Sequence, residues 1–217
     1  MKTRTDFSLS TIEAVPSGSK DPKLPIIIGL HGRGSDSQDL AGMAPEIDGD
    51  RAFRFFFPNA PKPFEVSPGM AYGFTWFDGW PASKESIEAS RRTLNTFIDE
   101  VNQAYPDHSD LALMGFSQGG LMTLDVGFRR PDVSTLVVMS GALYEKDPAD
   151  FRAHPGKHVL IVHGLYDDVI PVNAARRARA VLLSHGVDPA YEEYPMAHQV
   201  SAESMARIRQ FLNESMR

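Results

Sequence analysis

Short apolar runs alternate along the chain with segments that have the spacing of amphipathic helices. An apolar run of four to eight residues bounded by turn residues is typical of a buried strand. Such runs occupy residues 25–30, 52–57, 111–115, 133–139 and 158–162. Residues 190–194 predict a more exposed strand, and residues 7–15 predict an antiparallel strand at the edge of the sheet.

Four helices are predicted between or after these strands. Ser83 is a suitable N-cap, and the helix behind it carries apolar residues on one face and ends by Pro106. The other three helices cover residues 119–129, 173–184 and 201–216. Regular alternation of strand and helix predicts an α/β protein with a mostly parallel sheet and helices on both faces. A length of 217 residues suits a single domain over residues 1–217.

Residues 58–81 interrupt this alternation. They read PNAPKPFEVSPGMAYGFTWFDGWP, a stretch rich in proline, glycine and aromatic residues. Its aromatic residues are Phe64, Tyr72, Phe74, Trp76, Phe77 and Trp80. A structureless connection of this length in a compact domain is usually functional or disordered, and the aromatic content argues against disorder. We therefore expect residues 58–81 to form an aromatic lid or pocket loop.

The composition excludes several classes of protein. Lys and Arg number 22 and Asp and Glu 28, a net charge of −6 that argues against a nucleic-acid partner. Since the chain has no cysteine, disulfides, thiolate metal sites and thiol nucleophiles are excluded. No apolar stretch approaches the ~20 residues of a membrane helix, and residues 1–10 do not resemble a signal peptide. We therefore expect a cytoplasmic protein without membrane insertion.

A nucleophile elbow is the strongest local signal. Residues 115–119 read GFSQG, a G-x-S-x-G motif between a predicted strand and a predicted helix. Glycine at both flanking positions relieves collisions in a turn this tight, and the turn exposes the hydroxyl of Ser117 above the sheet. The motif predicts that Ser117 is a catalytic nucleophile.

A serine nucleophile needs a histidine base, and that histidine needs a carboxylate that fixes its tautomer. On this fold the chain order is serine, acid, histidine. His198 follows the last predicted strand, at the sheet edge where active sites gather, and is the preferred base. The other histidines after Ser117 fit packing, loop hydrogen bonds or a helix end: His154, His158, His163 and His185.

The acid is expected in the loop after the strand that precedes the His198 strand. That loop contains both Asp167 and Asp168, and the residues alone leave the choice open. An oxyanion hole needs backbone N–H donors, for which Gln118 at the helix start and Arg33 in the turn after residues 25–30 are the candidates.

Several motifs resemble one family of α/β-hydrolases, the bacterial carboxylesterase/phospholipase and acyl-protein thioesterase family. The matching motifs are LHGRG at residues 30–34, PNAP at 58–61, WFD at 76–78, GFSQGG at 115–120 and HGLYDDVIP at 163–171. The resemblance covers nearly the whole chain. Arg33 departs from it, because many relatives have an apolar residue there.

The resemblance implies an α/β-hydrolase fold with a seven-stranded sheet. It also implies hydrolysis of esters or thioesters without metal or cofactor, with Asp167 rather than Asp168 as the acid. The catalytic residues are then Ser117, Asp167 and His198, and the amides of Arg33 and Gln118 form the oxyanion hole.

The expected function is a serine carboxylesterase that hydrolyses short- to medium-chain esters through an acyl-serine intermediate. Met70, Trp76 and Phe77 are the candidates for the acyl pocket, although Trp76 and Phe77 could equally bury the loop against the sheet. The alternatives are an acyl-protein thioesterase, a lysophospholipase-type enzyme, a peptidase, or a small-molecule receptor with little turnover. We expect a small ester as the substrate and a monomer or homodimer.

Overall fold

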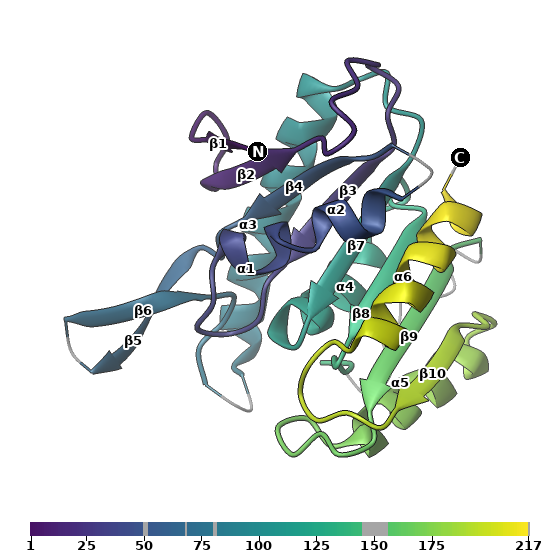
Figure 1. Cartoon of the computed structure of the whole chain (residues 1–217). Coiled ribbons are helices and arrows are strands. Elements are labelled where there is room, and N and C mark those ends of the chain that lie inside the picture. Colours follow the sequence, from purple (N-terminus) through teal and green to yellow (C-terminus); the bar gives the residue numbers. More distant parts are fainter. Residues whose placement is uncertain (50–51, 68, 80–81, 145–155, 217) are drawn as a thin grey trace.

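The computed structural model describes residues 1–49, 52–67, 69–79, 82–144 and 156–216. Within these residues, eight strands form one sheet in the order β1-β2-β4-β3-β7-β8-β9-β10 (Figure 1). The strands are β1 (Lys2–Arg4), β2 (Thr11–Ala14), β3 (Ile26–Leu30), β4 (Arg54–Pro58), β7 (Leu111–Phe116), β8 (Thr135–Met139), β9 (His158–Gly164) and β10 (Ala190–Tyr194).

The six neighbouring strands from β4 to β10 in that order run parallel to one another. Strand β2 pairs antiparallel with β4 on one side and with β1 on the other. The prediction of a mostly parallel sheet is confirmed. The predicted count of seven strands is wrong, because β1 pairs with β2 and becomes the edge strand of the described sheet. Since β1 has only three residues, Lys-Thr-Arg, it carries no apolar pattern that could reveal it.

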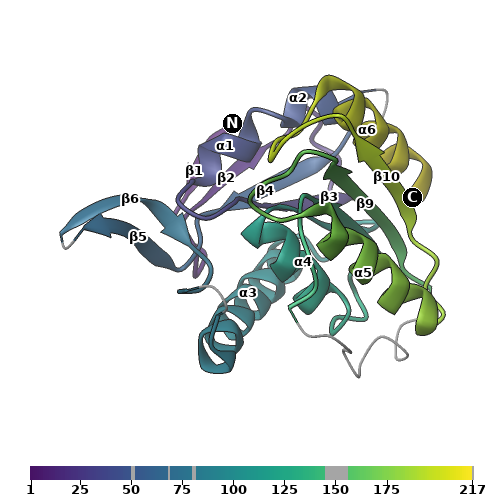
Figure 2. The same ribbon diagram turned by 90° about the horizontal axis from the view of Figure 1, so that it is seen from below.

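Helices cover both faces of the sheet, as predicted. Helices α1 (Ser37–Ala41), α2 (Ala44–Asp48) and α6 (Ala202–Ser215) lie on one face. On the other face lie α3 (Lys84–Ala104), α4 (Gln118–Gly127) and α5 (Val172–Ser184) (Figure 2). The four longer helices match the predicted ones, and Ser83 caps α3 by accepting from the Ser86 amide at 3.2 Å.

Two hydrophobic cores form because successive strand residues point to opposite faces. On β3, Ile26 and Ile28 pack with α3, α4 and α5, whereas Ile27 packs with α1, α2 and α6. All three isoleucines are fully buried. Burial on both faces explains why the parallel strands read as continuous apolar runs in the sequence.

The segment after β4, which was expected to form an aromatic lid or pocket loop, contains a hairpin that the sequence did not predict. Strands β5 (Lys62–Ser67) and β6 (Met70–Thr75) pair antiparallel and extend away from the sheet (Figures 1 and 2). Their exposure does not alternate regularly, so no period of two marks them in the sequence. Trp80 lies outside the described residues, as does His154.

The turn that follows β3 and the end of the hairpin are hydrogen-bonded to each other through residues 34–35. The Gly34 amide donates to the Phe74 carbonyl at 2.8 Å, and the Phe74 amide donates to the Ser35 carbonyl at 2.7 Å. Gly73 has φ 71, and any Cβ there would collide with the Gly34 carbonyl. Glycine at position 73 therefore permits the close approach of the hairpin to the turn that follows β3.

Among the described residues, we find no helix with both the length and the apolar character needed to cross a membrane.

Candidate active site

Ser117 occupies a sharp turn between β7 and α4, as the motif predicts. Its φ of 54 and ψ of −117 place it in a region that L-residues rarely adopt. A Cβ at position 119 would collide with the carbonyl of Leu30, and one at position 115 would collide with the carbonyl of Gly119. The two glycines therefore let α4 pack directly against the ends of β3 and β7.

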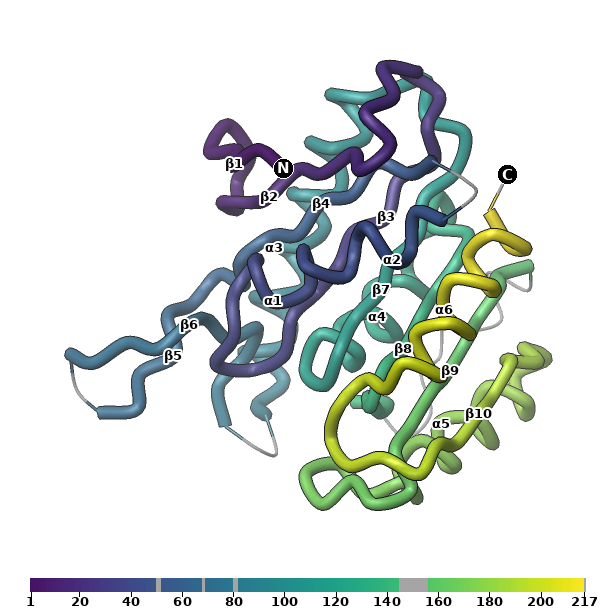
Figure 3. Tube along the Cα trace, viewed as in Figure 1, coloured from purple at the N-terminus to yellow at the C-terminus, as the bar shows by residue number. Residues whose placement is uncertain are grey.

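His198 lies beside Ser117, although 81 positions separate them in the chain. It stands in the loop that connects β10 to α6 and passes over the carboxyl end of the sheet (Figure 3). The distance from His198 Nε2 to Ser117 Oγ is 2.8 Å, and the distance from His198 Nδ1 to Asp167 Oδ2 is 2.7 Å. With Nδ1–H donating to the carboxylate, Nε2 is left to accept the serine proton.

Asp167 is the carboxylate that contacts His198, whereas its neighbour Asp168 is exposed. Asp167 Oδ1 accepts from the amides of Val169 at 3.0 Å and Ile170 at 2.8 Å. Burial alone would raise the pKa of Asp167, but hydrogen bonds from His198 and from these two amides outweigh burial and lower it. The carboxylate is thus held ionised and in a fixed orientation.

His163 lies on the other side of the same carboxylate. Its side chain is fully buried, and its Nε2 donates to the Ile170 carbonyl at 2.7 Å and lies 3.4 Å from Asp167 Oδ2. This contact fits the loop hydrogen bond expected from the sequence. His185 is the C-cap residue of α5, and His158 begins β9 and is exposed, so neither reaches Ser117.

Arg33 and Gln118, whose amides are the candidate oxyanion donors, both line the cavity at Ser117. Gln118 is the first residue of α4, where the N–H has no partner within the helix. Within the described residues, the amide of Arg33 makes no hydrogen bond. Arg33, Ser117 and Gln118 line one cavity together. This arrangement is suitable for an oxyanion hole. The guanidinium of Arg33 turns to the hairpin, with Cζ 4.7 Å from the centre of the Phe64 ring.

The turn that carries Arg33 is held by a buried histidine that the motifs did not single out. His31 Nε2 accepts from the Ala60 amide at 3.0 Å, so Nδ1 carries the proton and donates to the Gly32 carbonyl at 2.7 Å. Burial lowers the pKa of His31 and keeps it neutral.

The side chain of Gln118 fixes the segment after the hairpin. Its Oε1 accepts from Thr75 Oγ1 at 3.1 Å and from the Trp76 amide at 2.8 Å, and its Nε2 donates to the Phe77 carbonyl at 2.8 Å. Trp76 Nε1 donates to the His31 carbonyl at 2.9 Å. The elbow, the hairpin segment and the turn after β3 therefore form one hydrogen-bonded unit.

The cavity next to Ser117 has a volume of about 220 Å³ and mostly apolar walls. It is lined by Arg33, Phe77, Gly79, Ser117, Gln118, Leu121, Val169 and Ile170. Of the residues that the sequence suggested for the pocket, the structure brings Phe77 into this wall. Trp76 is fully buried and does not line the cavity, and Met70 is 62% exposed on the hairpin. Sequence reasoning missed Leu121 and Ile170, because the elbow and acid-loop motifs give no sign of which neighbours face the substrate.

Within the described part of the chain, no group of three or more His, Cys, Asp or Glu side chains is placed to hold a metal ion.

The family of the chain follows from a comparison of its sequence with known families. Residues 11–216 match the family described as Phospholipase/Carboxylesterase. The chain belongs to this family. The protein is therefore a hydrolase of the carboxylesterase and thioesterase class.

Individual relatives agree with this assignment. Acyl-protein thioesterase 1 of Kluyveromyces lactis is 28% identical, over 95% of this chain and 99% of the relative. The crystal structure of esterase PE8 has a TM-score of 0.78 at 26% identity and covers 95% of this chain and 98% of its own. A carboxylesterase from Mesorhizobium loti has a TM-score of 0.80 at 19% identity, covering 98% of both chains, which shows the same fold. The predicted α/β-hydrolase fold is confirmed.

Proposed function

We propose that the protein is a serine carboxylesterase that hydrolyses short- to medium-chain esters through an acyl intermediate on Ser117. The hydrogen-bonded chain from Ser117 Oγ through His198 to Asp167, with distances of 2.8 and 2.7 Å, carries the proposal. Two amides and an apolar cavity beside the serine add support. These parts together are what acyl transfer to water requires.

In the first half of the reaction, Ser117 Oγ attacks the ester carbonyl carbon and its proton passes to His198 Nε2. The carbonyl electron pair moves onto oxygen, and the amides of Arg33 and Gln118 stabilise the resulting charge. Loss of one such donor typically costs about 2.7–4 kcal/mol. Asp167 stabilises the imidazolium form of His198.

Collapse of the tetrahedral intermediate then breaks the bond to the leaving oxygen, which takes the proton from His198 Nε2. Water enters, gives a proton to the same nitrogen, and attacks the acyl-serine. The second collapse returns the proton to Ser117 Oγ and releases the carboxylic acid. The cycle uses one histidine first as a base and then as an acid.

The size of the cavity supports short and medium acyl groups. Its volume of about 220 Å³ lies below the ~300–1,000 Å³ of pockets for drug-sized ligands. Phe77 and Leu121 are the apolar side chains placed to contact the acyl chain. That Trp76 and Met70 also contact the acyl chain stays a prediction. Because a relative is named acyl-protein thioesterase 1, thioester hydrolysis is the second candidate.

A panel of p-nitrophenyl esters from acetyl to palmitoyl, with an S-palmitoylated peptide added, tests the proposal. We expect kcat/KM to peak between acetyl and octanoyl, because longer chains exceed the cavity. Ser117→Ala should lower kcat by about 10⁴-fold or more. The variant should still fold and show a cooperative thermal unfolding transition. Ser8→Ala, at an exposed serine, is the matched control.

Labelling with a fluorophosphonate supplies a readout independent of the substrate chosen. Mass spectrometry should find the adduct on Ser117. A wild-type rate in Ser117→Ala would contradict the proposal, and a preference for the palmitoylated peptide over all the esters would favour the thioesterase. Labelling of Ser117 with no turnover of any substrate would favour a receptor.

A further inference from the structure

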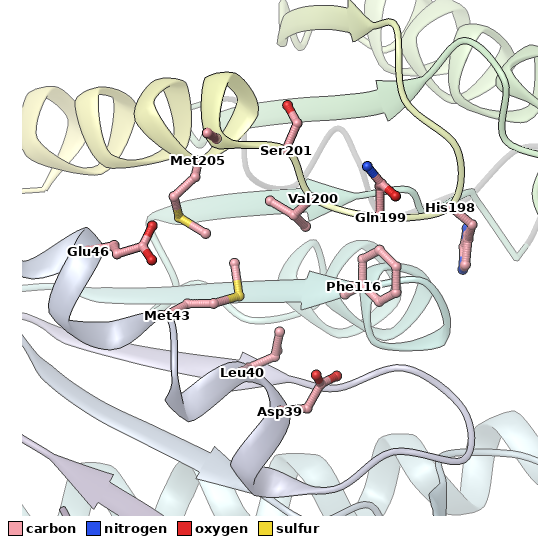
Figure 4. Close-up of a pocket in the computed structure, with 11 residues that line it drawn as sticks. Asp39, Leu40, Met43, Glu46, Phe116, His198, Gln199, Val200, Ser201 and Met205 are labelled. Atoms are coloured by element: carbon pink, nitrogen blue, oxygen red, sulfur yellow. The ribbon is translucent and has the colours of Figure 1, made fainter.

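A second and larger cavity borders His198 on the side of α1, α2 and α6. It has a volume of about 540 Å³. Figure 4 shows the side chains that line it. We refer to it as the His198 groove. It is lined by Asp39, Leu40, Met43, Glu46, Phe116, His198, Gln199, Val200, Ser201, Ala202 and Met205. Its lining residues come from α1, α2, the end of β7 and residues 198–205, which are far apart in the chain, so the sequence patterns did not predict it.

The two cavities border different parts of the reacting centre. The smaller one is lined by Ser117 together with Arg33 and Gln118, whose amides face the oxyanion in the proposed mechanism. The His198 groove is lined by the histidine but by neither of those two residues. In the tetrahedral intermediate the leaving oxygen must lie within hydrogen-bond reach of His198 Nε2. With the acyl group in the smaller cavity, the alcohol portion would lie on the side of His198, which also lines the His198 groove.

The groove combines an apolar lining with negative charge. Leu40, Met43 and Phe116 cover one side, and Val200 and Met205 cover another. Asp39 of α1 and Glu46 of α2 both contribute exposed carboxylates. None of the eleven lining residues is lysine or arginine. Within the described residues, neither carboxylate is engaged in a side-chain hydrogen bond or an ion pair.

Beyond Glu46 the electrostatic character changes. A further cavity of about 250 Å³ shares Glu46, Ala202 and Met205 with the groove and is also lined by Arg209. The acidic stretch is therefore limited to the part of the groove between His198 and Glu46. A positive charge on a ligand in this part of the groove faces Asp39 and Glu46, and Arg209 lines only the neighbouring cavity.

From this geometry we infer that the His198 groove binds the alcohol portion of the ester and selects alcohols that carry a positive charge, of the choline or aminoalkyl type. This inference rests on the proposed function, because it places the leaving group of the same reaction. The apolar lining accommodates the methyl or methylene groups around the nitrogen, and Asp39 and Glu46 complement its charge.

Butyrylthiocholine and 3,3-dimethylbutyl thiobutyrate test the charge preference. They share the acyl group and nearly the same shape, and a carbon replaces the positively charged nitrogen in the second. The two thiols differ in intrinsic leaving ability. The quantity compared between enzymes is therefore a ratio, the kcat/KM for butyrylthiocholine divided by the kcat/KM for the neutral thioester. We expect Asp39→Asn/Glu46→Gln to lower this ratio about threefold to tenfold, through loss on the choline ester.

The control is Asp107→Asn/Asp188→Asn, which changes the net charge equally at two exposed positions outside the groove. We expect this control to keep the wild-type ratio. Added salt should lower the ratio in wild type and leave it unchanged in Asp39→Asn/Glu46→Gln, since exposed charges are screened. An unchanged ratio in the groove variant, or an equal fall in the control, would overturn the inference.

Binding of the free alcohols separates this inference from the esterase proposal. Ligand-observed NMR with choline and 3,3-dimethylbutanol should show tighter binding of choline to wild type, with the preference lost in the groove variant. Hydrolysis of the neutral thioester with no charge preference would leave the esterase proposal intact and remove the groove assignment. If neither thioester is hydrolysed, the NMR result alone decides the groove assignment, and the p-nitrophenyl ester panel decides the esterase proposal.

Discussion

The Asp167 carboxylate accepts three hydrogen bonds in the site. One carboxylate oxygen accepts from the amides of Val169 and Ile170, and the other accepts from His198. The side chain is fully buried, and burial without these donors would favour the neutral acid. Two backbone amides thus help to keep Asp167 ionised and hold it in the orientation in which it contacts His198.

Asparagine substitutions at positions 167 and 168 test which aspartate supports His198. We expect Asp167→Asn to lower kcat for p-nitrophenyl butyrate by about 10⁴-fold, because an amide neither fixes the imidazole tautomer nor stabilises the imidazolium. Asp168→Asn should keep kcat within about threefold, since Asp168 is exposed. Circular dichroism checks that both variants fold. A larger loss in Asp168→Asn would reverse the assignment.

At the scale of elements, the start of α4 and the end of the hairpin behave as one unit. Gln118 is buried and makes three hydrogen bonds to residues 75–77. Ser90 of α3 donates to the Trp76 carbonyl, so a third element joins them. The Phe77 wall of the smaller cavity therefore depends on the side chain of Gln118, the residue directly after Ser117.

Removing the Gln118 side chain should weaken this unit while the backbone donor at position 118 is retained. We expect Gln118→Ala to lower the free energy of unfolding by about 2–4 kcal/mol, because the Trp76 amide and Phe77 carbonyl lose buried partners. Urea titration measures the change. Selectivity between acetyl and longer esters should also shift, since Phe77 lines the cavity. Gln103→Ala, at an exposed position of α3, is the control and should change neither quantity.

The longer elements could be predicted from the sequence because each buries a continuous or periodic apolar face. Helix α3 is an example, with Ile87, Leu94, Phe97, Ile98 and Val101 all buried as expected. Helices α1 and α2 have five residues each, too few for a helical period to stand out. The hairpin escaped prediction for a related reason, because its exposure does not alternate.

The same distinction applies to the site. Ser117, His198 and the acid loop could be located because the elbow motif and the chain order restrict them to strand ends. The choice between Asp167 and Asp168 needed either the family resemblance or the structure, because both lie in the same loop. The cavity walls could not be predicted, since Leu121, Ile170 and the residues of the His198 groove come together only through tertiary packing.

At the scale of the whole molecule, burial of His31 links stability to pH. The pKa of His31 is lowered in the folded protein, whereas the unfolded chain has an ordinary histidine with a pKa of ~6.5. Below that value the unfolded state binds the extra proton and the folded state resists it. This contribution to stability is therefore present above pH ~6.5 and is lost as the pH falls through the lower folded pKa.

Urea unfolding between about pH 7.5 and 5.5 measures this effect. We expect the free energy of unfolding of the wild type to decrease with falling pH more steeply than that of His31→Gln, which has no imidazole to titrate at this position. His158→Gln, at an exposed histidine, should keep the wild-type slope. Equal slopes in wild type and His31→Gln would show that His31 does not make this contribution.

The hairpin has a further consequence for protein engineering. It extends away from the sheet, yet its base is hydrogen-bonded to the turn that holds the Arg33 amide. A ligand-binding domain inserted between β5 and β6 would be connected through these bonds to the turn that carries the proposed oxyanion donor Arg33. The molecule thus offers a position at which an inserted domain could make the rate of ester hydrolysis depend on a chosen ligand, with no change to Ser117, His198 or Asp167.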